Sequence, residues 1–175
     1  MNLPFYIPDS ELNFRLGKLL LIFQVLSTGA KKPIYANLEN IGHFEFLLKH
    51  PVILNKILND KDKKVIQLQN SEMYSIEALF LNRAELFDLK SIKILIKLLL
   101  SYNYIEFKIL SDFKIYYIIT NEGLQKAEEL QSDYFQRLRN LNLELRPFIS
   151  LPSSKLGFLI DSHLNYGTKN KNTKT

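Results

Sequence analysis

Apolar residues recur at three- and four-residue spacing through the first third of the chain, a pattern that predicts helices with a buried face. The first helix is expected to begin at Asp9 or Ser10, which are good capping residues, and to end at Thr28. It is apolar on more than one face, so we expect neighbouring elements to bury it. A second helix is predicted over 37–49, and a short third one over 51–58 opens on a proline, which suits the first turn of a helix.

The middle of the chain carries weaker signals and then a strong one. The charged stretch 59–64 is expected to be a solvated loop, and 65–70 a short strand. Residues 75–84 predict a short helix. A longer helix is expected over 88–102, because Asp88 can cap it and its apolar residues again follow helical spacing.

Two runs after this helix alternate between apolar and polar residues, as strands with one buried face do. The first run spans 104–109 and the second 113–120, and the connection over 110–112 makes them a hairpin. We expect the apolar face of this hairpin to lie against the core.

Helical spacing returns after the hairpin. Thr120 is expected to cap one long helix that runs to about 145 and is ended by Pro147. A last helix is predicted to open at Pro152 or Ser153 and to run to about 164. The tail over 165–175, rich in Asn, Lys and Thr, is expected to be disordered.

This order of helices followed by a two-stranded hairpin indicates a winged-helix domain, in which the hairpin forms a wing beside a helix-turn-helix. We therefore predict a helix-dominated α+β fold, with residues 1–164 forming a single domain. Its parts are N-terminal helices over 10–58, the helix-turn-helix and wing over 75–120, and C-terminal helices over 120–164. The predicted core includes Leu16, Leu20, Phe44, Leu47, Leu95, Leu99, Phe107, Ile115 and Tyr117.

The composition indicates a folded, globular protein. Of the 175 residues 46% are hydrophobic and 23% charged, which gives enough apolar surface to offset the entropy of the chain. Cysteine is absent, so disulfides, thiolate metal sites and cysteine nucleophiles are excluded. No apolar run is long enough to span a bilayer and the first residues lack the features of a signal peptide, so we expect a cytoplasmic protein that does not engage membranes.

Positive charge is concentrated in one part of the sequence. The formal net charge is +5, but Lys169, Lys171 and Lys174 account for three of these charges and leave +2 for the body of the chain. Residues 89–119 carry five lysines against two acids, a net charge of +3, so the remainder of the body is at −1. A body so near neutrality is not typical of a dedicated nucleic-acid binder, and any basic footprint is local.

The sequence offers little for catalysis. His43 and His50 are seven residues apart on one helical face and would need a third ligand to hold a metal, so packing or capping roles explain them better. The paired carboxylates of Glu128 and Glu129 are expected to be solvated, and none of the glycines lies in a phosphate-binding loop. We therefore predict that the protein is not an enzyme and has no catalytic, metal-binding or cofactor-binding residues.

The candidate functional surface is a face of lysines. Three of them follow one side of the helix before the hairpin, and two lie on the hairpin face opposite the apolar one. Winged-helix proteins present this helix to the major groove of DNA and lay the wing on the backbone. The helix has no Arg, Asn or Gln to read bases, so the alternatives are phosphate contact, protein docking and a solvated surface. This lysine face consists of Lys90, Lys93, Lys97, Lys108 and Lys114.

Longer segments resemble a known family. FRLGKLLLIFQVLSTG and NLENIGHFEFLLKHPVIL are similar to the leucine-rich first helix and the His-Pro run of the middle component of bacterial ABC-three-component systems. NRAELFDLKSIKILIKLLLSYNYIEFK and YYIITNEGLQKAEEL resemble the winged-helix portion of that family, and the resemblance covers about 10–165. This sequence departs from the family pattern at Glu45, a position where aspartate is commoner in the family. The motif positions, for which we expect structural roles, are Leu38, Ile41, Phe44, Glu45, Phe46, Leu48, His50 and Pro51.

The resemblance implies a role within a complex. Middle components of this class work beside an SMC/Rad50-like ATPase and a variable effector, often a nuclease, and the Lamassu-type anti-phage and anti-plasmid systems belong to the class. The implied function is that of a non-catalytic subunit that docks on the ATPase and helps to restrain or position the effector, with any DNA contact non-specific. The alternative is a free-standing winged-helix transcriptional regulator, which would normally be a homodimer with Arg-rich recognition helices.

Overall fold

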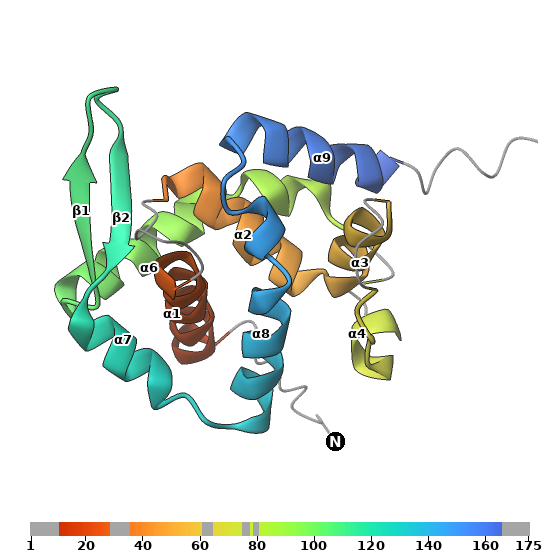
Figure 1. The fold of residues 1–175 in the computed structure, drawn as a ribbon, viewed down its shortest axis with the longest axis horizontal. Coiled ribbons are helices and arrows are strands. Elements are labelled where there is room, and N and C mark those ends of the chain that lie inside the picture. The colour runs from red at the N-terminus through yellow and green to blue at the C-terminus, as the bar shows by residue number, and fades with distance from the viewer. Residues whose placement is uncertain (1–10, 29–35, 61–64, 75–77, 79–80, 166–175) are drawn as a thin grey trace, which may run out of the picture.

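The computed structural model describes residues 11–28, 36–60, 65–74, 78 and 81–165, and these form a helix-dominated α+β fold with a two-stranded antiparallel sheet (Figure 1). The predicted fold class is confirmed. The caps expected at Asp9 or Ser10 and the lysines of the tail lie outside the described residues. The helices are α1 (Leu12–Thr28), α2 (Leu38–Lys49), α3 (Pro51–Asn59), α4 (Asn70–Tyr74), η2 (Arg83–Phe87), α6 (Leu89–Ser101), α7 (Asn121–Glu128), α8 (Asp133–Leu143), η3 (Arg146–Phe148) and α9 (Ser153–Asn165), and the strands are β1 (Ile105–Ile109) and β2 (Ile115–Ile119).

Helix α1 lies in the interior of the fold, and Figure 1 shows it foreshortened between α7 and α8. It packs against α2, α6, α7, α8 and strand β2. The five consecutive residues from Leu19 to Phe23 are each at most 2% exposed, which requires neighbours on every side of the helix. The prediction that this helix is buried on more than one face is therefore confirmed.

Side-chain caps fix the starts of three helices. Asn37 accepts a hydrogen bond from the backbone N–H of Asn40 at the start of α2, and Asp88 accepts one from Ser91 at the start of α6. Thr120 caps α7 and also donates its hydroxyl to the carbonyl of Asn103 at 2.6 Å. The predicted caps at Asp88 and Thr120 are confirmed, and the helix predicted from 37 has Asn37 as its cap.

Gly123 allows the start of α7 to approach the hairpin closely. A Cβ at this position would lie 2.0 Å from the carbonyl oxygen of Tyr104, which is closer than two such atoms can approach. The absence of a side chain, together with the cap at Thr120, therefore holds α7 directly beneath the base of the hairpin.

The hairpin is anchored at its base and stands clear of the helices at its tip (Figure 1). At the base, Ile105 and Ile119 are buried. Ala36 forms an isolated antiparallel bridge with Tyr117, so β2 has a partner on both sides at this point. The register pairs Ile105 with Ile119, Phe107 with Tyr117 and Ile109 with Ile115.

The prediction that Phe107 and Ile115 belong to the core is wrong. Phe107 is 55% exposed and Ile115 48%, because the outer half of the hairpin extends past the helices that cover its base. Alternation shows which strand residues share a face, but it does not show whether another element covers that face. Of the other predicted core residues, Leu16 and Tyr117 are partly buried and the following are buried: Leu20, Phe44, Leu47, Leu95 and Leu99.

The region between α3 and α6 differs from the prediction. Residues 65–69 form no strand, and α4 begins at Asn70. A side chain takes the place of a strand partner here, since Asn55 accepts a hydrogen bond from the backbone N–H of Ile66 at 2.7 Å. The helix predicted over 75–84 lies partly outside the described residues, and its described end is irregular until η2 begins at Arg83.

The single helix predicted over 120–145 is wrong, because the chain turns between α7 and α8. Arg139 stabilises this turn by donating to the carbonyls of Ala127 at 3.1 Å and Leu130 at 3.3 Å, and to Gln24 Oε1 at 2.6 Å. Carbonyls at a helix end have no partner within the helix, and the guanidinium supplies one. The apolar spacing continues across the turn because α7 and α8 both pack on α1.

The order α1, the Ala36 bridge, α2, α6, β1 and β2 is consistent with a winged-helix domain. A helix-turn-helix joins its two helices by a turn of about three or four residues. Here α3, α4 and η2 lie between α2 and α6. The winged-helix assignment and the division into parts therefore stay predictions. Among the described helices, none has the length and apolar character needed to cross a membrane.

Candidate interaction surfaces

The His-Pro run holds the junction of α2 and α3. The ring of His50 lies 4.4 Å from that of the buried Phe46, and Pro51 forms the first turn of α3. Glu45 accepts a hydrogen bond from Arg15 of α1 at 3.3 Å. These contacts are those of packing and ion pairing within the fold.

Burial keeps His50 uncharged. The side chain is 2% exposed, and burial lowers its pKa from the usual 6.5 to about 4. The carboxylate of Glu85, 3.6 Å from His50 Nε2, opposes this shift, but Lys49 lies 2.6 Å from the same carboxylate and competes for it. At neutral pH the imidazole is therefore neutral.

The other two histidines also have structural neighbours. His163 Nε2 lies 2.9 Å from Asp60 Oδ2, which joins α9 to the end of α3. His43 of α2 lies against Gly157 of α9, and burial lowers its pKa despite the attraction of Glu39. Within the part of the chain that the structure describes, no three His, Asp or Glu side chains are grouped to hold a metal ion.

The lysine face divides between a helix and the hairpin. Its hairpin members, Lys108 and Lys114, are exposed, and Lys108 Nζ lies 3.8 Å from the carboxylate of Glu106. The structure places all members of the face at the surface, and what they contact stays a prediction. The helical members lie exposed along α6: Lys90, Lys93 and Lys97.

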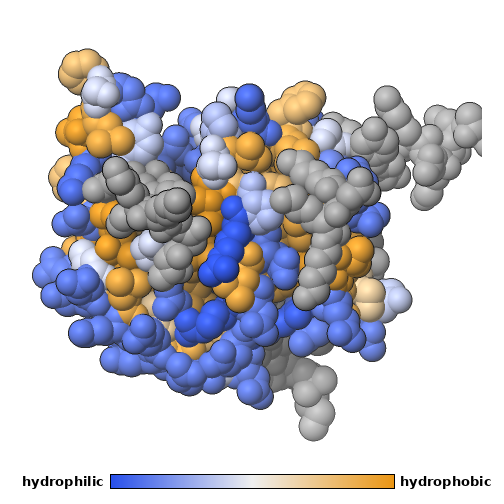
Figure 2. Space-filling view, viewed as in Figure 1, coloured by the Kyte–Doolittle hydropathy of each residue, from blue (hydrophilic) through white to orange (hydrophobic). Residues whose placement is uncertain are grey.

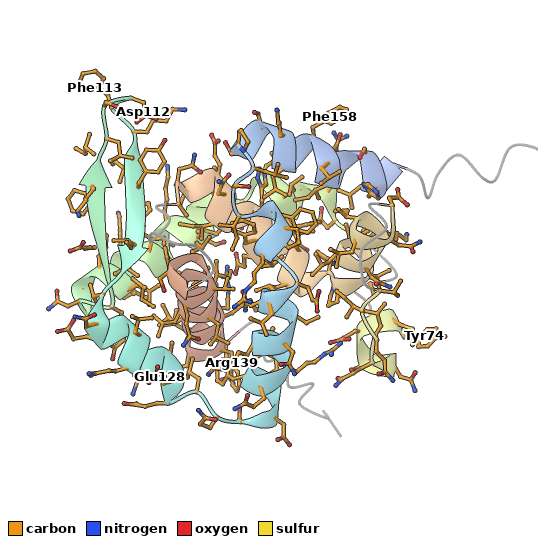
Figure 3. The ribbon with its side chains drawn as sticks, viewed as in Figure 1. Tyr74, Asp112, Phe113, Glu128, Arg139 and Phe158 are labelled. Atoms are coloured by element: carbon orange, nitrogen blue, oxygen red, sulfur yellow. The ribbon has the colours of Figure 1, made fainter. Side chains whose placement is uncertain are left out.

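The tip of the hairpin presents an aromatic side chain (Figure 3). Phe113 is 91% exposed and has a φ of 58°, a left-handed conformation that bulky residues rarely adopt. Next to it, Asp112 accepts hydrogen bonds from the hydroxyl of Tyr116 at 2.6 Å and the backbone N–H of Lys114 at 3.2 Å. The bond from Tyr116 lowers the pKa of Asp112 and raises that of the tyrosine. Side-chain bonds therefore fix a turn whose aromatic residue touches little of this chain.

Apolar side chains continue from this tip along one face of the hairpin. On this face Ile109 is 62% exposed, Phe107 55% and Ile115 48%, and Leu110 in the turn is 40% exposed. Figure 2 shows apolar residues at the surface along the hairpin. Isolated apolar residues on a surface are ordinary, but a contiguous group is typical of a contact site.

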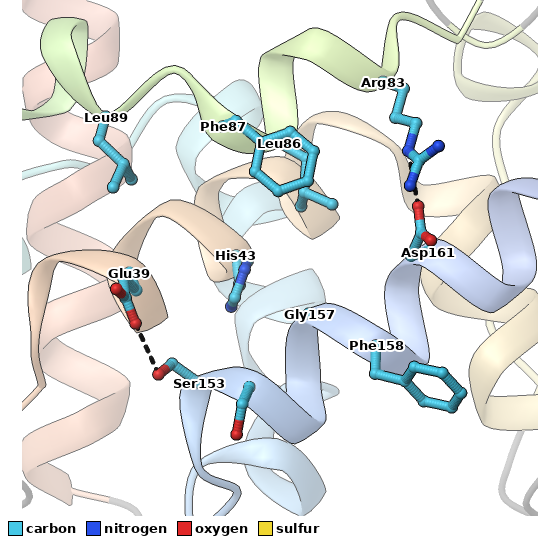
Figure 4. Close-up of a pocket in the computed structure, with 11 residues that line it drawn as sticks. Glu39, His43, Arg83, Leu86, Phe87, Leu89, Ser153, Gly157, Phe158 and Asp161 are labelled. Atoms are coloured by element: carbon cyan, nitrogen blue, oxygen red, sulfur yellow. Dashed lines mark hydrogen bonds and ion pairs between the residues drawn. The ribbon is translucent and has the colours of Figure 1, made fainter.

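A cleft of about 420 Å³ lies on another part of the molecule, between α2, η2 and α9 (Figure 4). Sequence reasoning missed it because its residues come from three separate stretches of the chain. No motif or spacing in the sequence links these stretches. The cleft is lined by Glu39, His43, Arg83, Leu86, Phe87, Leu89, Ser153, Ser154, Gly157, Phe158 and Asp161.

The described residues thus form a helix-dominated α+β fold with an exposed apolar hairpin face and a cleft between helices. A family model described as ABC-three component (ABC-3C) system Middle Component 4 matches residues 26–157. The chain belongs to this family and is a middle component of an ABC-three-component system, as the resemblance of the His-Pro run indicated. No curated protein and no solved structure matches the chain.

Proposed function

We propose that the chain is the non-catalytic middle subunit of an anti-phage and anti-plasmid defence complex of the Lamassu type. It docks on an SMC/Rad50-like ATPase in the cytoplasm and helps to restrain or position an effector, often a nuclease. The observation that carries this proposal is the family match over residues 26–157, since a middle component is one part of a system with several parts.

Two features of the structure support a role in docking. The outer hairpin exposes a contiguous apolar face, which a partner would cover. Two of the three histidines, which would be the first choice for acid–base chemistry, are engaged within the fold, with His50 2% exposed and His163 held by Asp60. We therefore propose that the catalytic steps belong to the partners.

Affinity purification of the tagged chain from cells that express the whole system tests this proposal. Mass spectrometry of the co-purified proteins is expected to identify an SMC-like ATPase together with an effector. Recovery of the chain as a lone homodimer, with no ATPase, would refute the proposal and favour the rival, a winged-helix transcriptional regulator. The chain on its own is expected to show no ATPase or nuclease activity.

The lysine face is the proposed contribution of this subunit to DNA contact by the complex. Such contacts would be to phosphates, so they would be independent of sequence and sensitive to salt. About 0.9 counterions are released per phosphate contact on duplex DNA, so three to five contacts would weaken binding by roughly 500- to 30,000-fold over a tenfold rise in salt.

Charge reversal of Lys90, Lys93 and Lys97 to Glu tests the face. We expect lower DNA affinity and a shallower salt dependence of the assembled complex, measured by fluorescence anisotropy, with assembly intact. The control reverses three exposed lysines elsewhere, which changes the net charge by the same amount. If the two variants bind DNA equally, the face has no role in DNA binding, and if only the first fails to assemble, the face is a docking surface. The control lysines are Lys56, Lys126 and Lys155.

A further inference from the structure

The cleft between α2, η2 and α9 has the form of a groove between helices. Its residues on α9 run from Ser153 to Asp161, which is about two turns or roughly 12 Å along the helix. The inner positions of this stretch are small: Ser153, Ser154 and Gly157. A Cβ at Gly157 would lie 3.0 Å from the ring of His43, so α9 approaches α2 as closely as it can here. The α9 wall of the groove is therefore about two turns long and lies close against α2.

Two phenylalanine side chains at the rim of the groove are exposed to solvent. Phe158 on α9 is 78% exposed and Phe87 at the end of η2 is 65% exposed (Figure 4). Two large apolar side chains at the rim of one groove form a surface that water covers at a cost in free energy. Because they project beyond the groove, a ligand that covers both must be larger than the groove itself.

The groove also has a polar floor and an uneven charge. His43 is 9% exposed, and among the described residues its Nδ1 has no hydrogen-bond partner. The ion pair of Arg83 with Asp161, at 2.7 Å, is neutral as a unit. Glu39, which accepts a hydrogen bond from Ser153 at 2.8 Å, then leaves the lining with a net charge of −1. The groove is thus apolar along its rims and negative at one end.

We propose that this groove binds an amphipathic helix of a partner protein. Apolar side chains of that helix lie between Phe87 and Phe158, and a lysine or arginine next to them pairs with Glu39. Helix-in-groove docking places anchors three and four residues apart, which suits a groove of about two turns. The basic character of the partner follows from the net negative charge of the lining. The inference deepens the proposed function, on which it rests, because the helix belongs to a subunit of the assembled complex.

The absence of cysteine from the sequence allows a direct test. Ser154→Cys places a single thiol at the groove and keeps both phenylalanines, and Glu128→Cys on α7 and Phe113→Cys at the hairpin tip place one elsewhere (Figure 3). Maleimide labelling rates are compared between the free chain and the purified complex. We expect assembly to slow labelling at position 154 by at least tenfold, and a thiol-to-amine cross-linker there to join a helical segment with apolar and basic residues.

The outcomes separate this inference from the proposed function. If the complex assembles and position 154 labels as fast as in the free chain, the groove is open and the inference is wrong while the proposed function stands. If position 154 is protected in the free chain at the same concentration, the occupant is a second copy of this chain, which also overturns the inference. If no complex forms, both proposals fail.

Affinity measurements test the chemistry of the occupant. Phe158→Ala is expected to weaken binding of the chain to its purified partner subunit by at least tenfold, whereas Glu39→Gln, which keeps the bond from Ser153, weakens it a few fold at low salt and less at high salt. Phe158 is exposed, so its replacement leaves the fold intact. Equal affinity of the Phe158→Ala variant and the wild type would overturn the inference, and tighter binding of Glu39→Gln would show that the partner is acidic there.

Discussion

The environment of His50 makes the stability of the chain depend on pH. The folded chain binds a proton at this ring only near pH 4, whereas the unfolded chain does so near the usual pKa of 6.5. A depressed folded pKa means that the contribution to stability is full above pH 6.5 and is lost as the pH falls towards 4. A pKa difference of this size corresponds to about 3 kcal/mol in the free energy of unfolding when His50 is the only group considered. His43, whose pKa is also lowered, adds in the same direction.

Replacing His50 with glutamine, which does not titrate, should flatten this dependence. We expect the free energy of unfolding of the wild type to fall between pH 7 and pH 4.5 by about 2 kcal/mol more than that of the His50→Gln variant. Urea denaturation at both pH values measures the difference, and the comparison removes carboxylate effects that both proteins share. Equal losses in the two proteins would show that His50 is not held neutral.

Arg139 is the residue that fixes the turn between α7 and α8 (Figure 3). Its guanidinium donates to two carbonyls at that turn and to Gln24 of α1, a geometry that a lysine cannot reproduce. Arg139→Lys is expected to lower the free energy of unfolding by about 1–3 kcal/mol, because partly buried acceptors lose their partner. Arg146→Lys, at an exposed position, is the control for the change of residue type. Identical urea midpoints for the two variants would contradict this role.

At the scale of the element, the hairpin divides into a stabilising base and an uncovered tip. Ile105 and Ile109 are on the same face of β1, but Ile105 is 2% exposed and Ile109 is 62% exposed. Ile105→Ala is expected to cost about 2–4 kcal/mol in the free energy of unfolding, and Ile109→Ala less than about 1 kcal/mol. Thermal or urea denaturation of the two variants gives the comparison. Similar costs would mean that the tip is packed in solution and not open.

Elements with strong local signals could be predicted from the sequence. Asn37, Asp88 and Thr120 mark helix starts, and the alternation on either side of 110–112 marks the hairpin. The turn after α7 could not be predicted, because apolar spacing continues across it while the deciding contact comes from Arg139, farther along the chain. The uncovered face at Phe107 could not be predicted either, since a strand pattern does not reveal how far the covering helices extend.

At the scale of the whole molecule, the lysine face could be predicted from the sequence, whereas the groove could not. The lysines share a helix and the hairpin that follows it, so spacing placed them together. The groove joins Glu39, Phe87 and Phe158, which meet only because α2, η2 and α9 pack against one another. The groove lies apart from the hairpin, whereas the lysine face meets the hairpin tip, where Lys114 follows Phe113.

The native size of the particles that contain this chain tests the central claim most directly. Extracts of cells that express the whole system at its natural level are separated by size-exclusion chromatography, and the chain and ATP hydrolysis are followed across the fractions. The account predicts that the chain elutes far ahead of its own monomer and dimer and that ATPase activity co-elutes with it. Elution of the chain as a monomer or dimer, apart from any ATPase, would contradict the claim that it works as a subunit of a larger complex.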